Sequence, residues 1–330
     1  MVLILSEDFL EKSTEEVIDW LDAYKHSYLR INGSDLLHDI NMHYTLSNDA
    51  RKNSLSEIIN EVSIVWGRRW FTFNDFLDDD IEEILLNKNN CANFKKHIAG
   101  ELNRYFSLFM RELSNKNWLP DWNYSNLDKI SVLEIASNFG LLIPMTLVCT
   151  RKSELIDFCD KNGWDVITKP LSEVSFYKDS TAMYTFKTEI AEKEIVEKMP
   201  DLFFPSLFQA NIRKKYEIRS FYIDSTFYSM AIFSQQDPST QTDFRNYNKD
   251  FPNRTVAYKL PFDIETKLDA IMKKLNLNTG SIDMIKAING DYIFLEINPV
   301  GQFGMTSFPC NYNLEKVIAN YLIKNDNVNE

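Results

Sequence analysis

The pattern of hydrophobic and polar positions predicts a β-hairpin between Ser281 and Asn298. Two runs rich in Ile, Phe and Tyr flank Asn289-Gly290, a dipeptide typical of two-residue hairpin turns. With these two residues as the loop, Asp283 is predicted to lie directly opposite Glu296. The face of these two acids is predicted to hold Ser281, Ile285, Phe294 and Asn298, and the opposite face Ile282, Met284, Ile293, Leu295 and Ile297.

The acidic face of this hairpin is a candidate metal site. Two carboxylates placed directly opposite each other repel unless a positive charge lies between them. Asp283, Glu296 and Asn298 offer only oxygen ligands, which are the ligands that Mg²⁺ prefers. The pattern therefore fits a magnesium site and a hairpin with a solvated acidic face equally well, and it leaves both interpretations open.

The rest of the pattern predicts a chain of mixed helices and strands. Val2 to Leu5 and Tyr28 to Asn32 are typical of strands, with a helix between them that begins near Ser13. Further helices are predicted over 78–87, 91–115, 126–139, 150–162, 262–275 and 314–323, and further strands over 165–169, 216–223 and 227–234. The polar stretch 234–253, about 20 residues long, is typical of a binding loop or lid.

Composition narrows the class of protein. With 330 residues and 44% hydrophobic content, the chain is long enough for a globular protein of several domains. Its formal charge of −12 argues against a nucleic-acid binder. Four scattered cysteines (Cys91, Cys149, Cys159 and Cys310) indicate neither a zinc site nor a disulfide framework. The apolar run at Val2 is too short for a signal peptide, and no run reaches membrane-spanning length, so we expect a cytoplasmic protein without membrane contacts.

Polar and charged residues follow one another in a recognisable order along the chain. They are Lys129 at a helix start, Lys169-Pro170 at a strand end, Phe208 to Ile212, Glu217 to Arg219, Asp283, and Glu296 to Pro299. This order resembles the ATP-grasp enzymes. The segments Val65 to Arg69, Tyr216 to Phe221, Gly280 to Asp283 and Leu295 to Phe303 are similar to those of graspetide maturases of the microviridin and grasp-with-spasm types. The resemblance spans essentially the whole chain.

The resemblance implies an α+β ATP-grasp fold in three parts. An N-terminal pre-ATP-grasp α/β domain is expected over 1–117, where Trp118-Leu119-Pro120 breaks a helix. A central lobe is expected over 118–205. A C-terminal lobe with the metal site is expected over 206–330, and the two lobes are expected to clamp ATP.

The resemblance also implies a role for each matching residue. Lys129 and Lys169 are expected to contact the ATP phosphates as point charges. Arg219 is expected to stabilise the transferred phosphoryl group, and Arg245 to grip the acceptor carboxylate. The hinge that reads adenine is expected to be Gln209, Ala210, Asn211 and Ile212, and the Mg²⁺ ligands Asp283, Glu296 and Asn298.

Some of these residues have simpler interpretations. Lys129, in a first helical turn, is also typical of a solvated lysine, and Arg219 of a surface ion pair with Glu217. Arg68 and Arg69 are interpreted as stacking partners of the neighbouring tryptophans. The chain departs from the family in one respect, because 170–189 contains no glycine where many ATP-grasp proteins have a glycine-rich flap. Ser172, Ser175, Ser180 and Thr181, or Lys178, are expected to build this flap instead.

The function implied is that of an ATP- and Mg²⁺-dependent peptide ligase. It is expected to activate Asp or Glu side chains of a ribosomally made precursor peptide as acyl-phosphates, which hydroxyls or amines of the same peptide attack. The precursor's leader is expected to bind at 178–198 and at the hairpin 213–235, and the enzyme is compatible with a homodimer. A ligase that adds a free amino acid to a carboxylate and a non-catalytic peptide-binding relative are the alternatives.

Overall fold

The structure of the protein is a computed structural model. It describes residues 1–7, 11–33, 35, 43–48, 51–53, 55–68, 91–120, 127–171, 176–178, 183–185, 188–237, 240, 241, 244 and 252–326. The helix predicted over 78–87, Arg69 and Arg245 lie outside these residues. The chain divides into two compact units, one of Met1–Tyr124, Gln302–Ser307 and Asn313–Glu330, the other of Ser125–Gly301 and Phe308–Tyr312.

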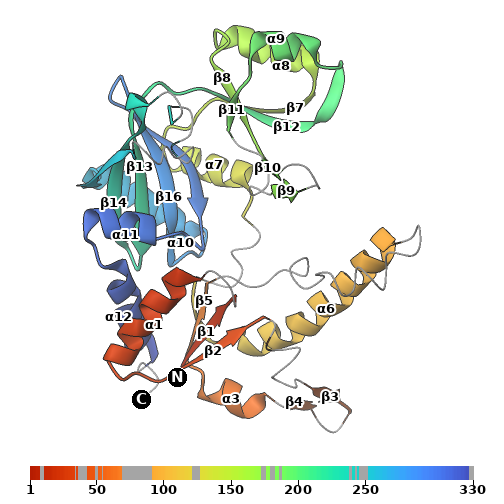
Figure 1. Ribbon diagram of the computed structural model, residues 1–330, viewed down its shortest axis with the longest axis vertical. Helices are drawn as coiled ribbons and strands as arrows, with labels where there is room; N and C mark the ends of the chain where they lie inside the picture. Colours follow the sequence, from red (N-terminus) through yellow and green to blue (C-terminus); the bar gives the residue numbers. More distant parts are fainter. Residues whose placement is uncertain are drawn as a thin grey trace. The chain divides into compact units, whose positions relative to one another are not determined.

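The first unit contains a parallel sheet of four strands (Figure 1). Its strand order is β2 (Tyr28–Asn32), β1 (Val2–Ser6), β5 (Ile64–Gly67) and β6 (Asn117–Leu119). The apolar run Val2 to Leu5 is fully buried, as expected for a strand covered on both faces. Helix α1 (Lys12–Ala23) follows β1, so the predicted strand, helix and strand are confirmed. The unit also contains the C-terminal helix α12 (Leu314–Asp326).

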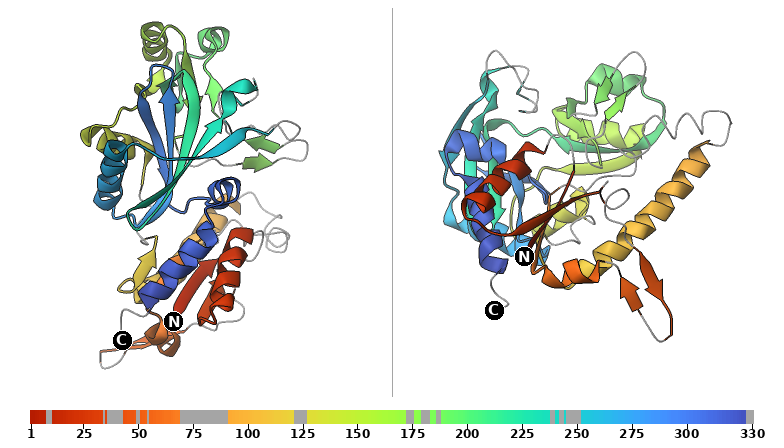
Figure 2. Two further views of the ribbon diagram at one scale, coloured as in Figure 1. Left: turned by 90° about the vertical axis from the view of Figure 1, so that its left-hand side faces the viewer. Right: turned by 60° about the horizontal axis from the view of Figure 1, so that its bottom comes forward.

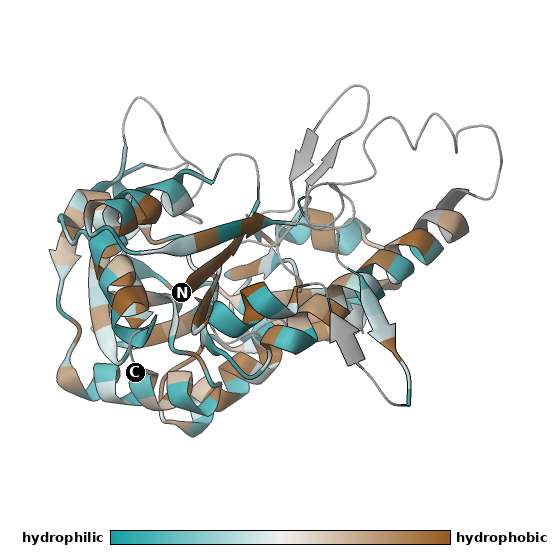
Figure 3. Cartoon of the chain, turned by 90° about the horizontal axis from the view of Figure 1, so that it is seen from below, coloured by the Kyte–Doolittle hydropathy of each residue, from teal (hydrophilic) through white to brown (hydrophobic). Residues whose placement is uncertain are grey.

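The longest helix of this unit is α6 (Cys91–Leu113), which the stripe of apolar residues predicts. Brown and teal bands alternate along it (Figure 3). Its C-terminal half buries Phe106, Phe109 and Leu113 against Leu3, Leu5 and the strands beside them. The smaller elements are β3 (Tyr44–Leu46), β4 (Arg51–Asn53) and α3 (Ser56–Glu61).

The second unit contains a sheet of four strands and a sheet of five, of which the smaller has the order β11 (Glu189–Ile190), β8 (Val166–Lys169), β12 (Leu202–Ala210) and β7 (Thr146–Arg151). Helices α8 (Lys152–Lys161) and α9 (Lys193–Lys198) cover it through Leu155, Phe158 and Val196, which pack with Phe208. The helix predicted from Thr150 is wrong at its start, because Thr150 belongs to β7 and the helix begins at Lys152. Strands β9 (Phe176–Lys178) and β10 (Met183–Thr185) form a separate antiparallel pair.

The larger sheet has five antiparallel strands in the order β15 (Arg254–Tyr258), β14 (Thr226–Phe233), β13 (Lys214–Ile223), β16 (Thr279–Ala287) and β17 (Tyr292–Asn298). The two predicted hairpins are confirmed. Helices α7 (Lys129–Asn138) and α10 (Phe262–Lys274) lie on the same side of the sheet (Figure 2). The remaining elements are η2 (Ser234–Gln236) and α11 (Gly304–Cys310). None of the helices within the described residues has the length and apolarity needed to cross a membrane.

The hairpin of β16 and β17 has the predicted register only at its open end. Asp283 lies opposite Glu296 as predicted, but beyond it Met284 pairs with Phe294 and Ile285 with Ile293. A β-bulge therefore leaves Leu295 as an extra residue. The turn is one residue longer than predicted, because the Ala287 N–H donates to the Asp291 carbonyl at 2.9 Å.

The bulge changes the faces of two residues. Phe294, predicted on the acidic face, lies with Met284 on the opposite face and is 0% exposed. Ile293, predicted on the opposite face, shares the acidic face with Ile285. The two-residue turn and these two assignments are therefore wrong. Burying a Phe side chain is worth about 1.5–3 kcal/mol, and this tertiary gain overrides the local turn preference.

Candidate active site

A row of three charged side chains crosses the larger sheet. Arg219 on β13 pairs in register with Asp283 on β16, which pairs with Glu296 on β17. The Arg219 Nη1 atom donates to both carboxylate oxygens of Asp283, at 3.0 Å each. The side chains of Arg219 and Asp283 are 8% and 12% exposed, so this is a buried ion pair. The positive charge that two opposed carboxylates require is therefore supplied by Arg219.

The interpretation of Arg219 as a surface partner of Glu217 is wrong. Glu217 is buried, and its Oε1 atom instead accepts from Lys214 Nζ at 2.6 Å and from Ser234 Oγ at 2.8 Å. Lys214 is buried as well, and sequence reasoning missed it. Its sequence signal was its place two residues after the expected hinge. The hydrogen bond from Ser234 to Glu217 connects β13, the strand that carries Arg219, to the first residue of the stretch 234–253.

The next row of the same face contains Ser281 and Asn298, which pair directly across the hairpin. Asn298 Nδ2 donates to Asp283 Oδ2 at 3.4 Å, so the structure brings the three predicted metal ligands together. Two carboxylates and one amide form an oxygen set that fits Mg²⁺. Among the described residues no group of three or more His, Cys, Asp or Glu side chains is arranged to hold a metal. An Mg²⁺ ion here would accordingly rely on Asn298 and on groups of a bound substrate.

Arg219 has hydrogen-bonding capacity beyond Asp283. Its Nε atom is buried and has no hydrogen-bond partner within the part of the chain that the structure describes. A buried unpaired donor costs free energy, and in native structures it is usually satisfied by water or a ligand. An anionic group beside the acidic row, such as a phosphoryl group, fits this requirement.

The predicted hinge connects the two sheets of the second unit. Gln209 is 1% exposed and donates from Nε2 to Thr146 Oγ1 at 2.9 Å. The N–H groups of Ala210 and Asn211 donate to the carbonyls of Met145 and Asp165. Because these two N–H groups already have acceptors within the protein, a base bound at this segment must form its hydrogen bonds with other backbone groups.

Beside the hinge lies an apolar cluster that sequence reasoning did not predict as a unit. Its buried members are Ile285, Ala287 and Ile293, and Ile212 and Leu295 pack against it. Ile293 lies on the acidic face because of the bulge, which no sequence pattern revealed. The same face therefore carries a charged row and, one row further, an apolar surface next to the hinge.

The two predicted lysines lie at neighbouring places. Lys129 begins α7, and its Nζ atom donates to the Pro170 carbonyl at 2.8 Å, directly after Lys169. Lys169 ends β8 opposite Leu207, which places it on the same face of the smaller sheet as Gln209. Lys129 is half-buried with a defined partner, which is more than a solvated lysine would have.

Asp128 sets the position of Lys129 as the N-cap of α7. Its Oδ1 atom accepts from the backbone N–H groups of Ile130 and Ser131 at 3.0 and 2.9 Å. The hydrogen bonds from Ser131 hold the pKa of the Asp128 carboxyl below its ordinary value. The helix therefore begins at a fixed residue.

The remaining predicted residues are not part of the acidic row or lie outside the described residues. Arg245, Ser172, Ser175, Ser180 and Thr181 lie outside the described residues, and of Lys178 only the backbone is described. Arg68 is 3% exposed and lies over the ring of Phe303, 5.1 Å from its centroid, with Glu11 Oε2 3.7 Å from its Nε. A stacking role for Arg68 is therefore confirmed, but the aromatic partner found is Phe303.

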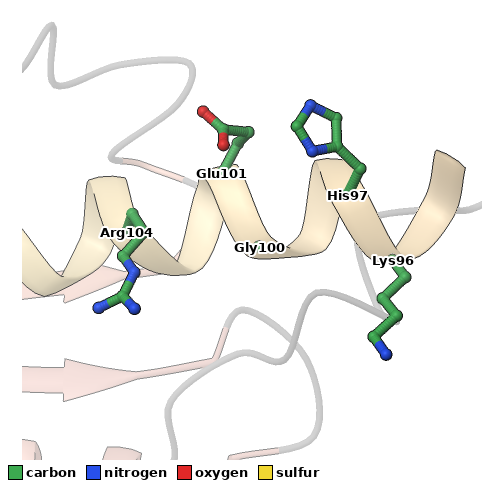
Figure 4. Close-up of a pocket in the computed structure, with 5 residues that line it drawn as sticks. All are labelled: Lys96, His97, Gly100, Glu101 and Arg104. Carbon is green, nitrogen blue, oxygen red and sulfur yellow. The ribbon is translucent and has the colours of Figure 1, made fainter. Parts of the chain in front are cut away.

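A surface hollow on α6 is lined by Lys96, His97, Gly100, Glu101 and Arg104 (Figure 4). All five are exposed and come from one helix. His97 and Glu101 point to one side, and Lys96 and Arg104 to the other (Figure 4). Because these groups do not converge, we assign the hollow no catalytic role.

No protein-family model matches the sequence, and no curated protein matches it either. Solved structures do match over the full length. The match to the macrocyclase MdnC bound with precursor peptide MdnA from Microcystis aeruginosa covers 98% of this chain and 99% of that one, at 26% identity and a TM-score of 0.77. A RiPP-associated ATP-grasp ligase from Chryseobacterium gregarium, in complex with ADP and a leader and core peptide, matches at 23% identity and a TM-score of 0.81 over 98% and 96% of the two chains.

A more distant structure shares the architecture. The D-alanine–D-alanine ligase from Bacillus anthracis, complexed with ATP, matches over 99% and 96% of the chains at 14% identity and a TM-score of 0.56. The chain therefore has the α+β ATP-grasp fold that its sequence predicts.

Proposed function

We propose that this chain, with its ATP-grasp fold, is an ADP-forming peptide ligase that crosslinks a ribosomally made precursor peptide. The observation that carries the proposal is the row of the buried pair Arg219 and Asp283 with Glu296, in a chain similar over its full length to a precursor-bound macrocyclase. Activated Asp or Glu side chains of the precursor are attacked by its own Ser or Thr hydroxyls or Lys amines. The products are esters or amides, ADP and phosphate.

The residues of the site fit the requirements of phosphoryl transfer. Asp283, Glu296 and Asn298 would hold Mg²⁺, which when bound would neutralise charge on the phosphates of ATP, the donor of the phosphoryl group. Arg219 orients the transferring group and stabilises negative charge through its buried guanidinium, a preorganised donor in a site of low dielectric constant. Lys129, at the start of α7, and Lys169, at the end of β8, contact the phosphates, and Arg245 holds the acceptor carboxylate.

The base of the nucleotide binds next to the hinge. Ile212 of the hinge packs against the apolar cluster of Ile285 and Ile293, and apolar side chains suit the flat face of adenine. The three-part division into 1–117, 118–205 and 206–330 places the phosphate-binding lysines in one lobe and the metal site in the other. The leader binds at 178–198 and at the hairpin 213–235.

Mass spectrometry tests the proposal directly. The protein is mixed with ATP, Mg²⁺ and a precursor peptide encoded beside its gene, and each ring formed lowers the peptide mass by one water. Unchanged peptide mass together with no ADP formation would overturn the proposal. A gain of one amino-acid residue would instead identify a ligase that uses a free amino acid. Peptide binding without nucleotide binding in calorimetry would identify a non-catalytic relative.

Two further properties belong to this proposal. We expect the enzyme to act in the cytoplasm, where its ATP is supplied. Size-exclusion chromatography with light scattering decides between the monomer and the homodimer, and a mass of one chain at micromolar concentration excludes the dimer.

A further inference from the structure

Ser281 is a buried residue of the acidic face whose hydroxyl has no assigned role. It lies on β16, two residues before Asp283 and directly opposite Asn298. It is 0% exposed, and its Oγ atom has no hydrogen-bond partner among the residues that the structure describes. Two of the site's buried polar atoms, this Oγ and the Nε of Arg219, share this condition.

The backbone packs closely around this hydroxyl. Gly301 has a φ of +44°, and a Cβ atom added to it would lie 2.7 Å from Ser281 Oγ and 2.8 Å from Ser281 N. Only a glycine therefore allows this approach. A buried hydroxyl without a hydrogen-bond partner destabilises a protein, so we expect the Ser281 hydroxyl to have a function that offsets this cost.

The residue that this hydroxyl can act on is Asn298, which lies directly opposite Ser281. In the structure its Nδ2 donates to Asp283 Oδ2 at 3.4 Å. Mg²⁺ binds the oxygen of an amide side chain and not its nitrogen. To present this oxygen, the Asn298 amide must rotate by half a turn about its last torsion, which exchanges the positions of its nitrogen and oxygen. The N–H groups then need a different acceptor. Side chains directly opposite in an antiparallel pair have Cβ atoms about 4.5–5.5 Å apart, which is within reach of a hydrogen bond.

We infer that Ser281 is a positioning residue of the metal site: its Oγ accepts a hydrogen bond from Asn298 Nδ2 and so turns the amide oxygen toward Mg²⁺. This inference rests on the proposed function. Partners that orient a metal ligand typically change metal affinity by about 10- to 100-fold when they are removed. Ser281 Oγ, which has no partner within the described part of the chain, would thus gain one when the metal binds.

The test compares Ser281→Ala with the matched control Ser220→Ala. Ser220 lies on β13 and is also 0% exposed, but its Oγ is paired with Ser229 Oγ at 2.7 Å. Two quantities are measured: the unfolding temperature without metal or nucleotide, and Mg²⁺ affinity at saturating ADP by calorimetry. For S281A we expect an equal or higher unfolding temperature and about tenfold weaker Mg²⁺ binding. For S220A we expect a lower unfolding temperature and unchanged Mg²⁺ binding.

A second variant, Asn298→Asp, distinguishes a positioning role of Ser281 from direct contact between Ser281 and the metal. In Asn298→Asp the side chain has two oxygens and no N–H group, so an added S281A change should have no further effect on Mg²⁺ affinity. A further tenfold loss in that background would overturn the inference in favour of direct coordination by Ser281. Unchanged affinity in S281A alone, or a lower unfolding temperature, also overturns it. Wild-type protein that binds Mg²⁺ and ADP but forms no rings contradicts only the proposed function.

Discussion

Removing the charge of Asp283 tests the buried ion pair at the centre of the site. The Asp283→Asn variant keeps the size of the side chain but removes the carboxylate that pairs with the Arg219 guanidinium, which is 8% exposed. Breaking one side of a buried pair typically costs about 3–5 kcal/mol. The Asn oxygen still accepts one hydrogen bond, so we expect the lower end, about 3 kcal/mol. For a unit of 150–250 residues, each kcal/mol lowers the melting temperature by about 2–4 °C, which gives a decrease of roughly 6–12 °C.

The measurement is thermal unfolding in EDTA without nucleotide, so that metal binding does not contribute. Glu296→Gln is the matched control, because Glu296 lies in the same row but is half-buried. We expect it to lose turnover with a shift of less than about 2 °C. Adding Arg219→Met to Asp283→Asn removes the unpaired charge, and the combined loss should be smaller than the sum of the single losses by about 2 kcal/mol. Equal melting temperatures for Asp283→Asn and wild type would refute the buried pair.

Substitutions at four further residues test the surrounding parts of the site. Lys129→Met and Lys169→Met each remove a positive charge from the phosphates and should raise the KM for ATP by about 10- to 100-fold in a coupled ADP assay, and an unchanged KM would exclude phosphate contact. Gly301→Ala brings a Cβ atom within 2.7 Å of Ser281, so we expect lower stability in urea and weaker Mg²⁺ binding, and wild-type values of both would show that the turn adapts. Asp128→Ala should lower the stability of the second unit by about 1 kcal/mol at pH 7, whereas Asp128→Asn should keep the cap. Because the folded pKa of Asp128 is lowered, the charge-dependent part of its contribution is complete above the unfolded value of about 3.9 and is lost as the pH falls through the folded value. Below that pH the stability of wild type should fall to that of Asp128→Asn and stay above that of Asp128→Ala.

The sequence was informative where local patterns decide structure. The alternation around Asn289-Gly290 predicted the hairpin, because strand periodicity reveals the two arms. The predicted pairing of Asp283 with Glu296 is also found, since the bulge at Leu295 offsets the extra residue of the turn. It did not predict the partner of Arg219, since Asp283 is 64 residues away along the chain while Glu217 is next but one. Charge patterns reveal near neighbours, whereas register between distant strands is decided by packing. The start of the helix at Lys152 was missed for a related reason: Thr150 resembles a helix cap locally, but its strand pairs with β12.

The bulge at Leu295 explains how one sheet face provides two kinds of surface. With a two-residue turn, Phe294 would lie on the acidic face and Ile293 would be buried behind it. The bulge instead buries Phe294, whose N–H donates to the Leu142 carbonyl at 2.8 Å, and places Ile293 beside Ile285. Rows on one face are two residues, or about 6.8 Å, apart along a strand. That spacing separates a charged row suited to phosphates and metal from an apolar row suited to a base, on adjacent positions of the same two strands.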